Sequence, residues 1–188
     1  MLTNAQCKLI WQIDTACRKC IRAVLYFNAV TNKTPEFWTF SQNCFGEIAT
    51  IQWCHVFNKY KDSTHFCQLF GDSTISAIDT DFAINNVRDR LRVAIGLTTD
   101  QYTAFRQEIV DFRNSYAAHM DYEKKGVVFP DLNIAMELCV EMRDIIRQLV
   151  VKAVTVKSSQ ESRLTHVFFK PMIGRHLVNF YFFLSQKN

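Results

Sequence analysis

Apolar residues recur at intervals of three and four along most of this chain, which is the pattern of helices that bury one face. The first such stretch begins at Thr3 or Asn4 and continues to about Asn28. After a polar break, Thr34-Pro35-Glu36 supplies a capping hydroxyl, a proline in the first turn and an early carboxylate. A second helix is therefore predicted over about residues 35–60.

The second helix is predicted to be central in a bundle, because apolar residues cover more than one of its faces. Its expected buried stripe consists of Phe37, Phe40, Cys44, Ile48, Ile51 and His55, with Trp38, Phe45 and Trp53 beside it. Since His55 follows the stripe, we interpret it as a packed, hydrogen-bonded side chain rather than as a ligand.

The rest of the chain predicts shorter elements and three more long helices. A short helix ending at Gly71 and a polar surface loop over 72–80 are expected first. The long helices are predicted through 82–95, closed by Gly96, then from Thr99 onward as an antiparallel neighbour, and finally over about 130–153. Residues 156–163 are predicted to be a linker.

Composition supports an all-α fold. Hydrophobic residues make up 48% and charged residues 21%, as in soluble globular proteins, while 5 Gly and 3 Pro leave little material for a turn-rich β fold. We expect an antiparallel bundle of about five long helices over residues 1–155, followed by a less regular appendage at 156–188 that packs on the bundle or on a partner subunit. Without a secretory signal or an apolar run of roughly 20 residues, a cytoplasmic protein with no membrane partner is expected.

The seven cysteines favour reduced, mostly buried thiols over a disulfide framework, because their number is odd and no export signal accompanies them. Cys17 and Cys20 form a lone CxxC, and Cys54, His55, His65 and Cys67 have spacings that match no familiar metal site. We therefore expect no metal and no cofactor. The sequence also lacks a glycine-rich phosphate loop, which excludes nucleotide hydrolysis on a P-loop.

Charge is unevenly distributed along the chain. The net charge is +4, but from Arg143 onward eight Lys or Arg face only Asp144 and Glu161, so the first 142 residues carry −2. A basic terminal segment is compatible with a phosphate backbone as partner, and equally with a solvated helix face.

The segment from Asp111 to Tyr122 carries the residues best suited to chemistry. It ends the helix that begins at Thr99, and it contains Arg113, Asn114 and His119. A guanidinium group offers a fixed, always charged fork for phosphate oxygens, and an imidazole moves a proton near neutral pH. Together they favour cleavage or binding of a phosphodiester.

Helix geometry constrains how these residues act together. At about 100° per residue, Arg113 and His119 are about 120° apart on a straight helix. Within one copy of the chain, the two side chains can contact the same substrate atom only if the helix frays after Ala118. A site built from two copies is the natural alternative. Asn114 points nearly away from the apolar stripe on an ideal helix, so a role for it requires the partner chain or a local kink.

An arginine with a polar residue after it, followed four to six residues later by a histidine near a helix end, resembles the signature of HEPN domains. The resemblance rests on Arg113, Asn114 and His119 and on a helical outline over roughly residues 35–152. It implies an all-α, metal-independent endoribonuclease of toxin, abortive-infection or CRISPR-associated type, in which each of two protomers supplies an Arg and a His. The implied partners are RNA, a second copy of the chain, and an antitoxin or regulatory protein.

Lys124, Lys125 and Tyr116 complete the predicted site as substrate-binding residues, since the two lysines lie in the loop just after His119. The HEPN branch paired with nucleotidyltransferase antitoxins has four residues between Arg and His and a tyrosine two after the His. In this chain five residues separate Arg113 from His119, and Tyr122 lies three residues after His119.

The alternative function is a non-catalytic helical RNA- or protein-binding module, in which Arg113 and His119 form a capping or interface pair.

Overall fold

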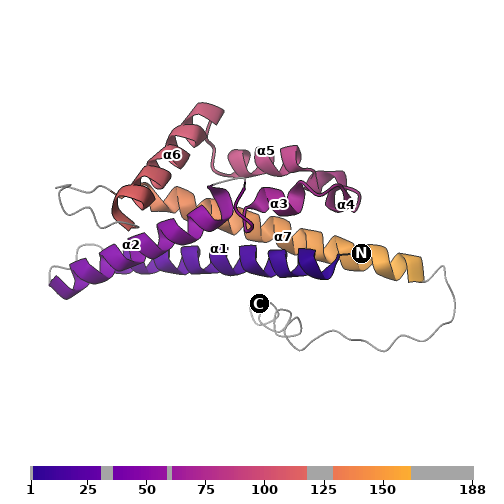
Figure 1. Ribbon diagram of the computed structural model, residues 1–188, viewed down its shortest axis with the longest axis horizontal. Coiled ribbons are helices and arrows are strands. Elements are labelled where there is room, and N and C mark those ends of the chain that lie inside the picture. Colours follow the sequence, from indigo (N-terminus) through magenta and orange to yellow (C-terminus); the bar gives the residue numbers. More distant parts are fainter. Residues whose placement is uncertain (1, 31–35, 59–60, 118–128, 162–188) are drawn as a thin grey trace. The chain divides into compact units, whose positions relative to one another are not determined.

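The computed structural model describes residues 2–30, 36–58, 61–117 and 129–161, with side chains as far as Ser115 and again from Phe129 to Val156 in the last two segments (Figure 1). The chain divides into two units, Met1–Lys157 and Ser158–Asn188. Within the described ranges the chain forms helices and turns and no strand, which confirms the predicted all-α class. The fold below is that of the first unit.

Two long helices form an antiparallel hairpin: α1 (Asn4–Val30) and α2 (Glu36–Phe57). They pack against each other closely, and the rings of Tyr26 and Phe45 meet across the hairpin with centroids 5.3 Å apart. Both helices begin within one residue of the predicted position, because the capping signals at Thr3–Asn4 and at Thr34–Glu36 are local.

The buried face of α2 differs from the predicted one. The structure buries Gly46, Ala49, Thr50, Trp53, Cys54, Val56 and Phe57. By contrast, Phe37 and Phe40 are each 65% exposed, and the side chain of His55 is exposed, so its interpretation as a packed histidine is wrong. Because apolar residues occur on every side of this helix, periodicity alone does not identify the side that meets its neighbours.

Three short elements follow α2: α3 (Phe66–Phe70), α4 (Ser73–Ser76) and a 3-10 turn, Thr80–Phe82. Gly71 ends α3 as predicted. The expected surface loop over 72–80 is instead largely structured, because Ile75 is fully buried and anchors α4. Gln6 of α1 holds this segment by donating hydrogen bonds of 2.8 Å to both Asp72 and Thr74.

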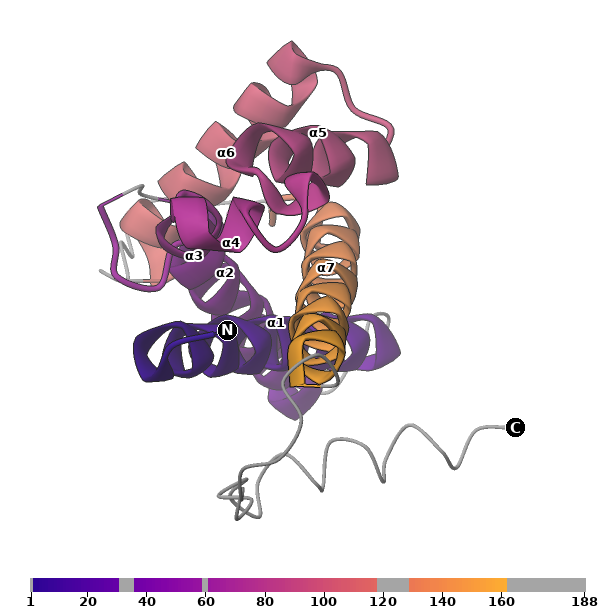
Figure 2. The same cartoon turned by 90° about the vertical axis from the view of Figure 1, so that its right-hand side faces the viewer.

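The next two helices are α5 (Ile84–Ala94) and α6 (Thr99–Phe112). Gly96 separates them at φ 65°, a left-handed conformation that glycine adopts readily. Thr98 and Gln101 form a reciprocal capping box that begins α6. The two helices diverge from their turn in Figures 1 and 2 rather than packing side by side, and α6 packs on α2 through an edge contact of 5.7 Å between Phe105 and Trp53.

The last helix, α7 (Leu132–Glu161), connects the hairpin to α5. Its Arg143 donates to Asp14 of α1 at 2.8 Å, while its Asp144 and Gln148 accept from Arg90 of α5 at 2.7 and 2.8 Å. The linker predicted over 156–163 is wrong as far as Glu161, because the helix continues through that residue.

All seven cysteines are free, and five of them, Cys17, Cys20, Cys54, Cys67 and Cys139, are buried. The thiol of Cys139 on α7 contacts those of Cys17 and Cys20 on α1, and burial raises its pKa well above the ordinary value. Since burial keeps a reagent away from the sulfur atoms, we expect the five buried thiols to be unreactive in the folded protein.

We therefore expect a thiol reagent such as DTNB to modify Cys7 rapidly, since it is exposed, and the half-buried Cys44 more slowly. The other five cysteines should react only after denaturation. Cys7→Ser should remove the fast phase and nothing else. Rapid modification of three or more thiols in the native protein would contradict this assignment of the core.

Candidate functional site

The candidate site begins where α6 changes its winding. α6 is anchored by Phe105, Ile109 and Phe112, which are all buried. The helix then continues as a π-helical turn, Arg113–Ala117. Single π-helical turns are rare, and they occur frequently at functional sites. The change from α-helical to π-helical winding starts at the arginine of the motif.

The π-helical turn brings Arg113 and Asn114 together. The Nη1 atom of Arg113 donates to the Asn114 Oδ1 at 3.1 Å, although the two residues would diverge on a straight α-helix. Arg113 is half-buried, Asn114 is exposed, and Arg113 forms no ion pair with any carboxylate of the described residues. Among the described residues, its remaining donors therefore meet no carboxylate, as the binding of an external anion requires.

The positive charge of Arg113 also affects the pKa of a thiol on α2. Burial raises the pKa of the Cys54 thiol to about 12, and the guanidinium groups of Arg113 and Arg106 act in the opposite direction. Arg106 precedes Arg113 by seven residues, which places both on one side of α6 about 10 Å apart along its axis. The side of α6 toward α2 is therefore positive along two turns.

Phe129 packs at the base of the site. Its ring lies 4.8 Å from that of Phe112, which directly precedes Arg113, and 5.0 Å from that of Phe27 on α1. Gly46 of α2 makes room for it, because a Cβ at that position would lie 2.2 Å from the Phe129 ring. The sequence signal for this contact was a glycine inside a helix, which periodicity analysis passed over.

Most of the predicted site residues have no described side chain. His119, Lys124 and Lys125 lie outside the described residues, as does Tyr122. Tyr116 belongs to the π-helical turn by its backbone, but its side chain is not described. The structure thus brings together Arg113 and Asn114 of the predicted set, and sequence reasoning missed Phe129, Gly46 and Arg106.

His65 fixes the chain between α2 and α3. Its Nδ1 accepts a hydrogen bond of 3.1 Å from the Cys67 amide and caps α3, and its ring also bonds the Phe57 carbonyl at the end of α2. Burial lowers the pKa of His65 to about 4. The imidazole is therefore neutral in the folded protein at pH 7.

This neutral histidine makes folding pH-dependent. Because its pKa in the unfolded chain stays near 6.5, acid protonates the unfolded state first. The free energy of unfolding should be insensitive to His65 above pH 6.5 and then fall by about 3 kcal/mol in total toward pH 4. Urea titrations across that range should show this loss, whereas His65→Asn, which keeps a capping acceptor but does not titrate, should lack it. Equal slopes for both proteins would contradict the buried, neutral state.

No group of three or more His, Cys, Asp or Glu is arranged to hold a metal ion in the part of the chain that the structure describes. None of the helices described is both long enough and apolar enough to cross a membrane. No family model, curated protein or solved structure matches the chain.

Proposed function

We propose that the protein is a metal-independent endoribonuclease of HEPN type, acting at a site formed across a homodimer in a phage-defence or toxin system. Arg113 of one copy and His119 of the other face the same phosphodiester. The observation that supports this proposal most is the π-helical turn at Arg113, whose guanidinium group bonds Asn114 and meets no carboxylate among the described residues.

The chemistry follows from these groups. The ribose 2′-hydroxyl attacks phosphorus and loses its proton, the bond from phosphorus to the 5′-oxygen breaks, and the leaving oxygen gains a proton. His119 serves as general acid or base in these transfers. Arg113 neutralises the charge that develops on the phosphate oxygens, and Asn114 holds its guanidinium fork in position. Lys124, Lys125 and Tyr116 are proposed to contact the RNA backbone on either side.

Incubation of the protein with mixed RNAs in EDTA tests the proposal. We expect cleavage products with 2′,3′-cyclic phosphate and 5′-hydroxyl ends. An oligonucleotide with a single 2′-deoxyribose at the cleaved position should resist, because it lacks the nucleophile. Cleavage of that oligonucleotide at an equal rate, or products with 3′-hydroxyl ends, would reject this mechanism.

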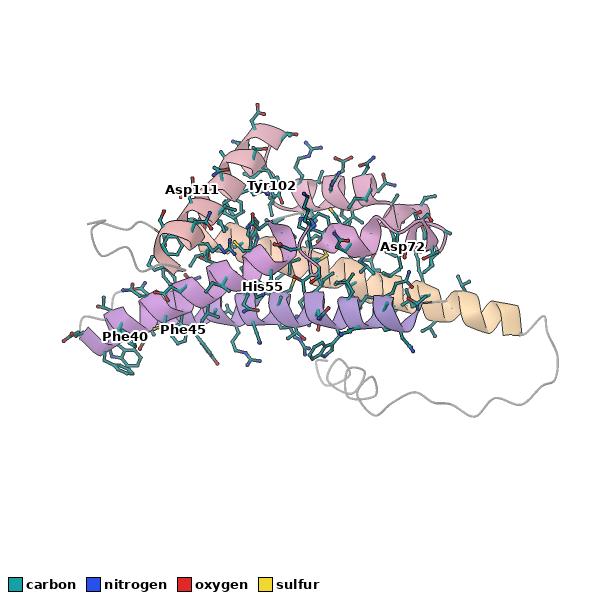
Figure 3. The ribbon with its side chains drawn as sticks, viewed as in Figure 1. Phe40, Phe45, His55, Asp72, Tyr102 and Asp111 are labelled. Carbon is teal, nitrogen blue, oxygen red and sulfur yellow. The ribbon has the colours of Figure 1, made fainter. Side chains whose placement is uncertain are left out.

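A non-catalytic RNA- or protein-binding module is the second candidate, and one observation favours it. Large side chains are exposed near the start of α2, with Phe37 65%, Trp38 37% and Phe40 65% exposed, and Figure 3 labels Phe40 there. Exposed apolar residues that gather on one element mark interaction surfaces. Tight binding of RNA without cleavage in EDTA would favour this candidate over the first.

A further inference from the structure

Arg106 also belongs to a second group of arginines, which lines a cleft that does not include Arg113. The cleft has a volume of about 370 Å³ and lies among the end of α2, α3, α5 and α6. Arg88 and Arg92 contribute from α5 and Arg106 from α6, together with the side chain of Tyr102, which Figure 3 labels on α6. None of these residues belongs to the predicted Arg113–His119 site.

The three arginines leave positive charge uncompensated. Arg88 contacts the Cys67 sulfur at 3.4 Å and Arg106 donates to the Asn58 carbonyl, so neither is neutralised by a carboxylate among the described residues. The lining contains one acidic residue, Asp89, which lies 3.3 Å from Arg92. The cleft therefore has an excess of guanidinium charge.

Not every arginine of α5 lacks a carboxylate partner, as the neighbouring Arg90 shows. Arg90 points to the other side of the helix and is bonded to Asp144 and Gln148 of α7. It is therefore structural, whereas Arg88 and Arg92, one turn apart, share the side that faces the cleft.

The other polar groups in the cleft are neutral. Burial raises the pKa of Tyr102 to about 12 and lowers that of His65 to about 4, so both rings are uncharged at pH 7. Neither supplies the missing negative charge. A guanidinium fork in a partly enclosed site binds phosphate oxygens through paired, charge-assisted hydrogen bonds.

The size and the apolar lining of the cleft indicate a ligand larger than an inorganic anion. Its volume lies at the lower end of the range for small-molecule pockets, roughly 300–1,000 Å³. Phe66 and Leu91 give it apolar walls beside the ring of Tyr102. We propose that this cleft binds a nucleoside monophosphate, with the phosphate on Arg88 and Arg106 and the nucleoside against the apolar wall.

Isothermal titration of the full chain with 5′-AMP, adenosine and inorganic phosphate tests the proposal. We expect 5′-AMP to bind at least tenfold more tightly than either fragment. Arg88→Ala and Arg106→Ala should each weaken its binding at least tenfold, and the second variant carries the test if the first fails to fold. Arg22→Ala is the matched control, because it removes one exposed arginine on α1, outside the cleft, and should change the affinity less than twofold.

Three results would overturn this site: no binding of 5′-AMP at millimolar concentration, equal losses in Arg22→Ala and Arg88→Ala, or equal affinities for 5′-AMP and one of its fragments. The same titration on Arg113→Ala should give wild-type affinity. Nucleotide binding is thereby measured separately from RNA cleavage, so either proposal can fail alone.

Discussion

Arg113→Ala should lower the rate of RNA cleavage by about 100- to 1,000-fold, the usual effect of removing one preorganised donor from a developing anion. The guanidinium group forms no ion pair with a described carboxylate, and it donates a side-chain hydrogen bond to the exposed Asn114. Its truncation should therefore change the free energy of unfolding by less than about 1 kcal/mol. Initial rates in EDTA, together with urea denaturation, measure the two quantities.

Arg113→Lys and Arg22→Ala are the control variants for the effect of Arg113→Ala on the cleavage rate. The lysine variant keeps the positive charge but loses the planar fork, so its rate should fall between those of the wild type and Arg113→Ala. Arg22→Ala removes one exposed charge from α1 and should cleave at close to the wild-type rate. Wild-type rates in Arg113→Ala would reject the site.

Trp53→Ala should destabilise the protein by about 3–5 kcal/mol, the range for removing a fully buried aromatic side chain. Trp53 is 0% exposed, its ring stacks on Phe57 at 5.2 Å, and it meets Phe105 of α6 edge-on at 5.7 Å. The substitution removes the aromatic contact between α2 and the helix that carries Arg113. Urea denaturation followed by far-UV circular dichroism measures the change.

Trp11→Ala is the control for this prediction, because Trp11 is 62% exposed and should contribute no more than about 0.5 kcal/mol. Trp53→Phe should fall between the two, since it keeps an aromatic ring and removes an indole N–H that has no hydrogen-bond partner within the described part of the chain. Equal stability of Trp53→Ala and Trp11→Ala would show that the core between α2 and α6 is wrongly placed.

The helices whose ends carry local signals were predictable from sequence. The capping box of Thr98 and Gln101 and the left-handed Gly96 each act within a few residues, and the sequence signal Thr34-Pro35-Glu36 is equally local, so the sequence nearby predicts where these helices begin and end. The face that α2 buries depends instead on its neighbours. Phe129 enters beside Gly46 from a distant part of the chain, and no periodicity within α2 encodes that contact.

The candidate site, too, was predictable in part and dependent on distant contacts in part. Arg113 and Asn114 were identified from their side-chain chemistry and spacing, and the structure joins them by a hydrogen bond. The π-helical turn that does so has no sequence signature, because it inserts one residue into a helix without requiring a glycine or a proline. Arg106 was not singled out, because its position beside the cleft depends on the path of α3 and α5.

The most direct test of the proposed shared active site is to mix two inactive variants, Arg113→Ala and His119→Ala, after dissociating and reassociating the copies. If each site takes its arginine and its histidine from different copies, half of the randomly formed dimers contain one complete site, and about a quarter of the wild-type cleavage rate should return. A mixture that forms mixed dimers but remains as inactive as either variant alone would contradict the account.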